Sequence, residues 1–281
     1  MRPVPLTFAE RLETAVKRSA SLLCVGLDPD PSKLPADLKG ADEPFLAFNR
    51  RIIEATADLA AAYKPQIAFY AAHGAEEQLA KSIAFIRERA PHALVILDGK
   101  RNDIGNTAEA YALEAFVRYG AHAVTVNPYM GEDSVRPFVK DPAFGAVLLC
   151  RTSNPGARDF QDLDVGGLPL YRRVAERAAN AWNEHGNLML VVGATVPSEM
   201  AELRQAHPSM PFLVPGIGAQ GGDLEATLKA GLTRSGEGLL ISASRSIIYA
   251  GDAAAIRRAA ADLHAAINAH RAHLPRHARS A

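Results

Sequence analysis

Eight short apolar segments, separated by helical patterns, constrain the fold of this chain more than any other feature. The apolar segments cover residues 21–28, 58–66, 93–100, 122–128, 145–150, 188–194, 211–218 and 238–244. Most of them are continuously apolar instead of alternating, which is typical of strands buried on both faces in a parallel sheet. Helical periodicity fills the intervals, at residues 43–60, 75–90, 107–120, 169–186, 198–208, 223–236 and 252–274.

Eight strands that alternate with helices over 281 residues predict a (β/α)8 TIM barrel. An open, doubly wound sheet is the alternative, but eight parallel strands in a chain of this length favour closure. No internal repeat is present beyond the alternation itself. We therefore expect one barrel domain over residues 1–281, with its core at about 8–265 and a frayed tail at about 268–281.

Composition excludes several classes of partner. Lys and Arg number 31, as do Asp and Glu, so no net charge attracts nucleic acid or an anionic membrane. We find no uninterrupted apolar segment of about 18 residues that could span a membrane, and residues 1–20 lack the apolar centre of a secretory signal. Cys24 and Cys150 both lie in apolar segments, and two buried, unpaired thiols suit a reducing cytoplasm. We therefore expect a cytoplasmic protein that binds neither nucleic acid nor membrane.

The histidines give no sign of a metal site. The residues in question are scattered without metal-ligand spacing: His73, His92, His122, His185 and His207. The sequence therefore predicts no bound metal.

Charged side chains end the third apolar segment and continue beyond it, at Asp98, Lys100 and Asp103. Asp98 and Lys100 are two positions apart, so on a strand they point to the same side. Because carboxylates on either side stabilise an ammonium group, we expect Lys100 to be protonated. A protonated lysine is a poor Schiff-base nucleophile but a good proton donor and partner for negative charge. A non-catalytic ion network at the barrel rim is the alternative.

Two more apolar segments end in a charge. Lys64 lies near the end of the second segment, where a rim lysine with a buried stem is the simple interpretation. Together with Lys100, Lys64 could complete an alternating array of charges across the barrel mouth. Asp28 ends the first segment, where its carboxylate could accept hydrogen bonds from sugar hydroxyls or cap the next turn. Asn106 precedes Glu109 by three positions, a pattern typical of a helix N-cap.

The loops after the last two strands predict a phosphate site, because barrels commonly bind phosphate there. Residues 215–223, PGIGAQGGD, contain glycines such as Gly218 and Gly221 that let backbone N–H groups approach an anion. Arg245 follows the eighth segment and offers charge-assisted hydrogen bonds. A plain loop with a surface arginine is the alternative. Residues 153–169 form the one long irregular segment, typical of either a functional cover or a disordered loop.

Together these motifs resemble the orotidine 5′-phosphate decarboxylase family, in its longer bacterial subgroup (type 2). The D-x-K-x-x-D-I signature is present from Asp98 to Ile104. The segments CVGLDPDP, YKPQIAFY, GNTAEAYA, SNPGA, PGIGAQGGD and SRSI occur in the expected order, and the resemblance covers about residues 8–265. It implies cofactor-free decarboxylation of orotidine 5′-monophosphate (OMP) to UMP and carbon dioxide, in de novo pyrimidine biosynthesis.

The resemblance implies that four residues form a catalytic Lys-Asp-Lys-Asp charge array: Lys64, Asp98, Lys100 and Asp103. In this family the last aspartate reaches the active site of the neighbouring subunit. Asp103, Ile104 and Thr107 therefore imply a homodimer with shared active sites. Gly99 and Asn102 replace the alanine and glycine expected between the charged positions, which puts local packing in question but not the chemistry.

The resemblance also implies substrate contacts. Asp28 matches the ribose-binding aspartate and Ser153 the pyrimidine-binding serine. Gln220 and Arg245 match the clamp on pyrimidine and phosphate.

Two alternatives to a decarboxylase remain open. A metal-dependent lyase similar to hexulose-phosphate synthase shares the D-x-K-x-x-D pattern, but its site has an acidic residue where this chain has Lys64. Because a lysine repels a divalent metal, Lys64 favours the decarboxylase. The second alternative is a non-catalytic barrel that binds a phosphate ligand, against which the complete charge array argues.

Overall fold

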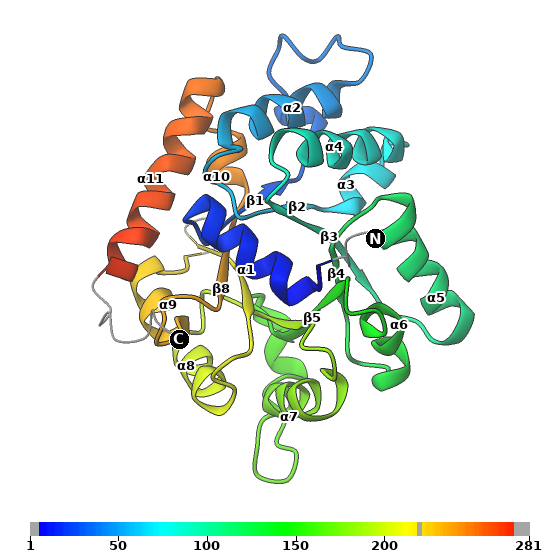
Figure 1. Ribbon diagram of the computed structural model, residues 1–281, viewed down its shortest axis with the longest axis vertical. Coiled ribbons are helices and arrows are strands. Elements are labelled where there is room, and N and C mark those ends of the chain that lie inside the picture. Colours follow the sequence, from blue (N-terminus) through cyan, green and yellow to red (C-terminus); the bar gives the residue numbers. More distant parts are fainter. Residues whose placement is uncertain (1–5, 218–220, 273–281) are drawn as a thin grey trace, which may run out of the picture.

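The computed structural model describes residues 6–217 and 221–272, and its centre is a closed barrel of parallel strands (Figure 1). The strands are β1 (Leu23–Leu27), β2 (Ala62–Pro65), β3 (Leu94–Arg101), β4 (Ala123–Val126), β5 (Gly145–Arg151), β6 (Leu188–Val192), β7 (Phe212–Pro215) and β8 (Leu239–Ala243). Each strand pairs with its neighbours in sequence, and β8 pairs with β1. The predicted (β/α)8 TIM barrel is confirmed.

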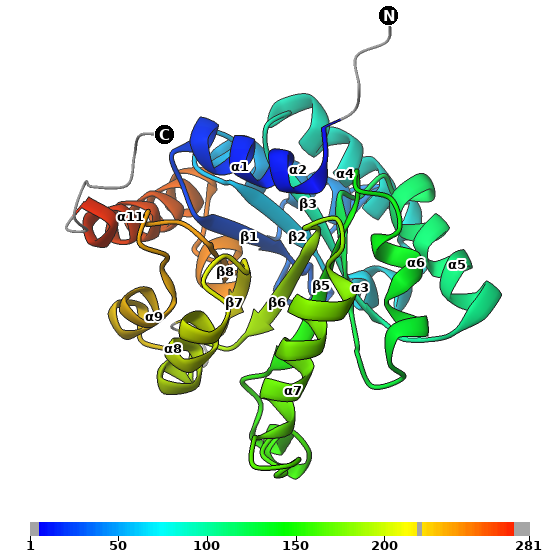
Figure 2. The same ribbon diagram turned by 60° about the horizontal axis from the view of Figure 1, so that its bottom comes forward.

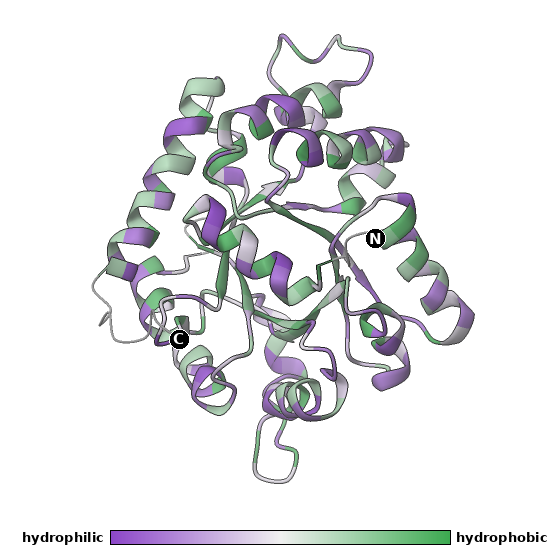
Figure 3. Ribbon diagram, in the orientation of Figure 1, coloured by the Kyte–Doolittle hydropathy of each residue, from purple (hydrophilic) through white to green (hydrophobic). Residues whose placement is uncertain are grey.

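Helices surround the barrel, and each carries both hydrophilic and hydrophobic residues along its length (Figure 3). The longer ones are α2 (Pro44–Thr56), α4 (Glu76–Arg89), α5 (Gly105–Leu113), α7 (Leu170–Arg177), α8 (Pro197–Ala206), α9 (Leu224–Gly231) and α11 (Ala253–Ala272). Shorter helices are α3 (Ile67–Ala71), α6 (Arg136–Val139) and α10 (Arg245–Ile248). Three 3₁₀ helices are η1 (Pro31–Lys33), η3 (Glu132–Ser134) and η4 (Pro155–Asp159), and two π-helical segments are η2 (Glu114–Arg118) and η5 (Ala178–Trp182). Because their apolar residues pack on the strands, strand and helix side chains form one core.

An additional helix, α1 (Phe8–Ser19), crosses one mouth of the barrel (Figure 1). A capping box between Thr7 and Glu10 begins this helix. The buried Phe8 packs on Gly145, where an added Cβ would lie 2.7 Å from the ring. In Figure 2, α1 and the loop at residues 153–169 lie at opposite ends of the molecule. The α1 helix thus covers the end opposite the carboxyl ends of the strands.

The helix that follows β3 begins earlier than expected. We expected Asn106 to be an N-cap, but α5 begins at Gly105 and Asn106 is already inside its first turn. Gly105 has a φ of 56°, which glycine adopts without strain, so the chain turns into the helix one residue before Asn106. The capping prediction was wrong.

Two segments are more regular than expected. Residues 153–169 contain η4 and an isolated antiparallel bridge between Asp164 and Pro169, so this segment is a structured loop. The tail expected to fray from about residue 268 is helical as far as Ala272. Asn268 donates a hydrogen bond to the carbonyl of Ala20 (2.9 Å) and Arg271 donates one to that of Gly236 (2.7 Å), so both hold the end of α11 on the barrel. Residues 273–281 lie outside the described residues.

Candidate active site

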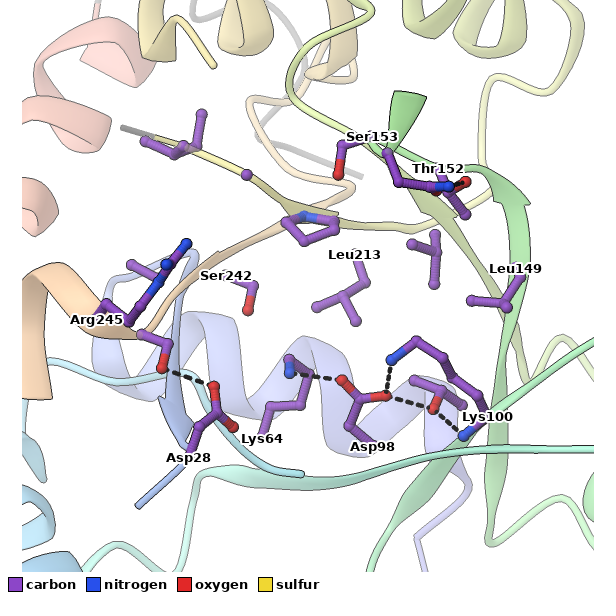
Figure 4. A pocket seen from close by; sticks show the side chains of 18 of the residues that line it. Asp28, Lys64, Asp98, Lys100, Leu149, Thr152, Ser153, Leu213, Ser242 and Arg245 are labelled. Carbon is purple, nitrogen blue, oxygen red and sulfur yellow. Dashed lines mark hydrogen bonds and ion pairs between the residues drawn. The ribbon is translucent and has the colours of Figure 1, made fainter. Parts of the chain in front are cut away.

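A pocket of about 710 Å³ opens at the carboxyl ends of the strands. It brings together six of the residues predicted from the sequence: Asp28, Lys64, Asp98, Lys100, Ser153 and Arg245 (Figure 4). These residues come from or directly follow β1, β2, β3, β5 and β8. Because all strands of a parallel barrel point the same way, residues distant in sequence meet at this one edge.

A chain of three charged groups crosses the floor of the pocket (Figure 4). The Nζ atom of Lys64 lies 2.8 Å from Oδ2 of Asp98, and the Nζ atom of Lys100 lies 2.7 Å from Oδ1. Lys64 and Asp98 are buried, whereas 49% of the Lys100 side chain is exposed. The buried carboxylate is therefore held between two ammonium groups, of which Lys100 is the one that solvent reaches most.

The backbone geometry that brings the Lys100 side chain to Asp98 differs from the one predicted. Strand periodicity predicted that the two side chains share a side, but the β3–β4 register shifts between Leu97 and Arg101. Lys100 lies within this irregularity at a φ of 44°, a conformation uncommon for any residue but glycine. Strained backbone of this kind costs on the order of 1–3 kcal/mol and clusters at functional sites. The local bulge, not regular pleating, aims the Lys100 ammonium at Asp98.

Thr125 on β4 stabilises this bulge, and the sequence analysis missed it. Its hydroxyl accepts hydrogen bonds from the backbone N–H groups of Gly99 (3.0 Å) and Lys100 (2.8 Å). The same hydroxyl donates to Oδ1 of Asp98 (2.8 Å). The available signal was a single polar residue within the apolar segment Ala123–Val126. Thr125 thus orients the backbone on one side and the carboxylate on the other.

The environment keeps the buried pair ionised. Burial alone would lower the pKa of Lys64, but attraction to Asp98 and Asp28 outweighs burial and raises it above its usual value. Burial likewise favours neutral Asp98, but Lys64 and Lys100 outweigh it and hold the pKa of this carboxyl well below its usual range. Beneath the pair, burial raises the pKa of the Cys24 thiol to about 12, so the thiol stays neutral. The pocket floor therefore carries fixed charges at neutral pH.

Asp28 offers an acceptor to a ligand. Its Oδ2 accepts a hydrogen bond from the Ser244 hydroxyl (2.7 Å), whereas its Oδ1 is buried with no hydrogen-bond partner. A buried carboxylate oxygen without a partner is costly, so a ligand hydroxyl that donates to it would gain free energy. Arg245 begins α10 next to Ser244 and also lines the pocket.

The glycine-rich segment after β7 makes tight turns at the pocket edge. Pro215, Gly216 and Ile217 line the pocket, and Gly216 has a φ of 102°. A Cβ on Gly222 would lie 2.7 Å from the carbonyl oxygen of Gly216, so the close approach requires glycine. Gly221, with a φ of 83°, is exposed and is absent from the pocket lining among the described residues. Gly218 and Gln220 lie outside the described residues.

Three predicted residues lie elsewhere in this chain. Asp103, Ile104 and Thr107 are not part of the pocket lining over the ranges that the structure describes. The Asp103 carboxylate accepts a hydrogen bond from the Ile104 backbone N–H (2.8 Å). Ile104 is 49% exposed and lines a second cavity, of about 680 Å³, between α5, α6 and η5. Within one chain, these residues therefore face a different surface.

A buried arginine anchors the loop over the pocket. Arg151 ends β5, and its guanidinium lies 2.9 Å from Asp162 and 5.3 Å from the ring centre of Tyr171. Gln161, which lines the pocket, accepts a hydrogen bond from the Thr152 N–H (2.9 Å) and donates one to its hydroxyl (2.8 Å). Sequence reasoning gave no role to Arg151 or Gln161. Both tie the 153–169 segment to the end of β5.

The fold and the pocket together define a class: TIM-barrel enzymes with ionised lysine and aspartate side chains at the carboxyl ends of the strands, beside a glycine-rich loop. A sequence model described as the orotidine 5′-phosphate decarboxylase / HUMPS family matches residues 21–259. The chain belongs to this family.

Two curated relatives and one solved structure support this assignment to the family. An orotidine 5′-phosphate decarboxylase of Dechloromonas aromatica (strain RCB) is 56% identical over 270 residues, which cover 95% of this chain and 100% of the relative. One from Azoarcus sp. (strain BH72) is 56% identical over 268 residues, 94% of this chain and 99% of the relative. The structure of Leishmania donovani OMP decarboxylase superposes with a TM-score of 0.83 at 44% identity, covering 95% of this chain and 99% of that one.

No helix in residues 6–217 or 221–272 is long and apolar enough to cross a membrane. In the same ranges, no three His, Cys, Asp or Glu side chains gather in a way that could hold a metal ion. Cys24 and Cys150 are buried free thiols.

Proposed function

We propose that this protein is a carboxy-lyase that converts OMP to UMP and carbon dioxide without a cofactor. The observation that carries the proposal is the chain of contacts from Lys64 to Asp98 (2.8 Å) and from Asp98 to Lys100 (2.7 Å) on the pocket floor. The names of the curated relatives support the same activity.

The reaction leaves an electron pair on a ring carbon that cannot delocalise it. As the bond between that carbon and the carboxyl group breaks, carbon dioxide departs and the ring carbon becomes a carbanion. The ammonium group of Lys100 stabilises this charge as it develops and then transfers a proton to the carbon. Solvent reprotonates the half-exposed Lys100, which completes the cycle.

Asp98 has two roles in this scheme. Its negative charge, fixed by Lys64 and Thr125, lies where it crowds the departing carboxylate of the substrate. It also keeps the ammonium of Lys100 aimed at the reacting carbon before the substrate binds. Because these groups are already oriented, little reorganisation is needed during the reaction.

Contacts remote from the ring hold the substrate. The free Oδ1 of Asp28 accepts a hydrogen bond from a ribose hydroxyl, and Arg245 with the glycine-rich segment binds the phosphate. Ser153, which follows β5 and lines the pocket, contacts the pyrimidine. This binding energy holds the 153–169 loop over the site and excludes water.

The first prediction concerns metal dependence, because the family description also covers lyases of the HUMPS type. We expect purified protein to decarboxylate OMP at the same rate with and without EDTA, measured as loss of pyrimidine absorbance. The buried ammonium of Lys64 repels a divalent cation from this pocket, which is the physical reason. No reaction, or a reaction that requires added divalent metal, would reject the proposed function.

We further propose that the active protein is a homodimer with shared active sites. Several large apolar side chains are exposed just before α5, in α5, in η2 and in the segment after β4: Ile104 (49%), Leu113 (61%), Val117 (70%), Tyr129 (79%) and Met130 (45%). An exposed apolar surface of this kind is typical of an interaction site. Asp103 lies at the edge of this surface, directly before Ile104, and in a dimer reaches the pocket of the partner.

The second prediction tests the shared site by subunit mixing. Lys100→Ala and Asp103→Ala proteins, each inactive alone, are expected to regain activity when their subunits exchange. In a mixed dimer one pocket contains both substitutions and the other contains neither, so about a quarter of wild-type activity is expected after random exchange. Exchange is verified by native mass spectrometry of differently tagged subunits. Confirmed exchange without recovery of activity would contradict the shared site.

A further inference from the structure

Tyr249 joins the first and last strands beyond the point where their pairing ends. The β1–β8 pairing stops at Val25 and Ala243, and Tyr249 directly follows α10. Its hydroxyl donates a hydrogen bond to the carbonyl of Asp28 (3.0 Å) and accepts one from the N–H of Asp30 (2.7 Å). One side-chain hydroxyl thus supplies both partners that a neighbouring strand would have supplied.

The ring of Tyr249 is itself held in place. It stacks on Phe48, with ring centres 5.4 Å apart and planes inclined by 20°, and the Nζ atom of Lys33 lies 5.7 Å above it. Burial raises the pKa of the Tyr249 hydroxyl, which therefore keeps its proton for the bond to Asp28. The hydroxyl that makes the two hydrogen bonds is therefore held in a fixed position by its ring.

Asp28 is bound to the 244–249 segment twice. Tyr249 binds its backbone, and the Ser244 hydroxyl binds its Oδ2 (2.7 Å), which leaves Oδ1 as the oxygen without a partner. The same short segment carries Arg245. The carboxylate and the guanidinium that line the pocket are thereby fixed relative to one another.

We infer that Tyr249 is a positioning residue, which acts through Asp28 to set the distance between the ribose contact and the phosphate contact. This inference rests on the proposed function, because it takes the ligand to be a ribonucleoside monophosphate. A ligand that spans Asp28 and Arg245 binds tightly only when both groups are held at the right separation. Neither the sequence motifs nor the family resemblance assigned a role to Tyr249.

A Tyr249→Phe variant tests the inference, because it retains the stacked ring and removes both hydrogen bonds. We expect KM for OMP and the Kd for UMP to rise about tenfold, the usual effect of losing a buried hydrogen bond at a binding site, with kcat changed less than about threefold. In a protein that already carries Asp28→Ala, Tyr249→Phe is expected to leave KM and Kd unchanged, because Tyr249 acts by positioning the carboxylate of Asp28.

A matched control is Tyr63→Phe. Tyr63 is fully buried on β2, shares a hydrogen bond with the Thr56 hydroxyl (2.9 Å) and does not line the pocket. This variant is expected to unfold at a lower temperature but to keep the wild-type KM and Kd. A purely structural Tyr249 would behave in the same way.

Two results would overturn the inference: a Tyr249→Phe variant with KM and Kd within twofold of wild type, or effects of Tyr249→Phe and Asp28→Ala that multiply in the double variant. The Kd for UMP separates this question from catalysis. Wild-type protein that binds UMP but does not decarboxylate OMP would reject the proposed function, while the variants would still decide the role of Tyr249. Wild-type protein that does not bind UMP would overturn both.

Discussion

Replacement of Lys100 with alanine is expected to lower kcat for OMP by at least about 10⁴-fold, the combined scale of lost proton transfer and lost charge stabilisation. The variant leaves no ammonium group beside the carbanion, because the Nζ atom of Lys64 is buried against the other oxygen of Asp98. Steady-state decarboxylation, followed by pyrimidine absorbance, measures the effect. The fold should persist, since Asp98 keeps its bonds to Lys64 and Thr125.

Lys81→Ala provides the control for Lys100→Ala. Lys81 also forms an ion pair, with Glu43 (2.6 Å), but on the exposed surface of α4. We expect this variant to have wild-type activity. If Lys100→Ala retained activity within tenfold of wild type while circular dichroism showed an intact fold, the role assigned to Lys100 would be wrong.

The substitution Asp98→Asn is expected to reduce both activity and stability. Removal of the charge leaves Lys64 buried without its nearest counter-ion, and breaking a buried ion pair costs about 3–5 kcal/mol in the free energy of unfolding. Activity should fall by at least about 10³-fold, because neither the ammonium of Lys100 nor the departing carboxylate meets a fixed negative charge. Urea unfolding and OMP turnover measure the two effects.

The control for Asp98→Asn is Glu43→Gln, which neutralises an exposed partner of Lys81. Exposed ion pairs contribute about 0–1 kcal/mol, so we expect little change in stability and none in activity. An Asp98→Asn protein as stable as Glu43→Gln would show that the buried pair does not hold the pocket floor together.

The stability difference between wild type and Asp98→Asn should also depend on pH. The folded-state pKa of Asp98 lies below the unfolded value, so its carboxylate contributes fully above the unfolded value of about 3.9 and progressively less as pH falls toward the folded pKa. We therefore expect a constant difference from pH 5 to 8, and a smaller difference below about pH 4. A difference that grows toward acid would have the wrong sign.

Much of the fold could be predicted because strands buried on both faces leave continuous apolar segments. Helix α1 was the exception. Its signal, Thr7 followed three residues later by Glu10, lies in a segment considered only as a possible signal peptide. Asn106 shows the opposite error, because a local capping pattern did not reveal that the chain turns one residue earlier, at Gly105.

The candidate site could be predicted in its charges but not in its geometry. Lys64, Asp98 and Lys100 lie at the ends of apolar segments, and a barrel brings such positions together. The left-handed backbone of Lys100 had no sequence signal, because glycine is the usual residue there. Thr125 and Tyr249 act through hydrogen bonds to backbone groups distant in sequence, which only the folded chain brings within reach.

A crystal structure of the protein with bound UMP would show whether the ammonium group of Lys100 is in place to protonate the pyrimidine ring. The distance to measure is that from the Nζ atom of Lys100 to the ring carbon that carried the carboxylate. We expect about 3–3.5 Å, the separation at which a proton can be transferred, with Asp98 still held between the two lysines. A ring bound elsewhere in the pocket, or a Lys100 ammonium directed away from that carbon, would contradict it.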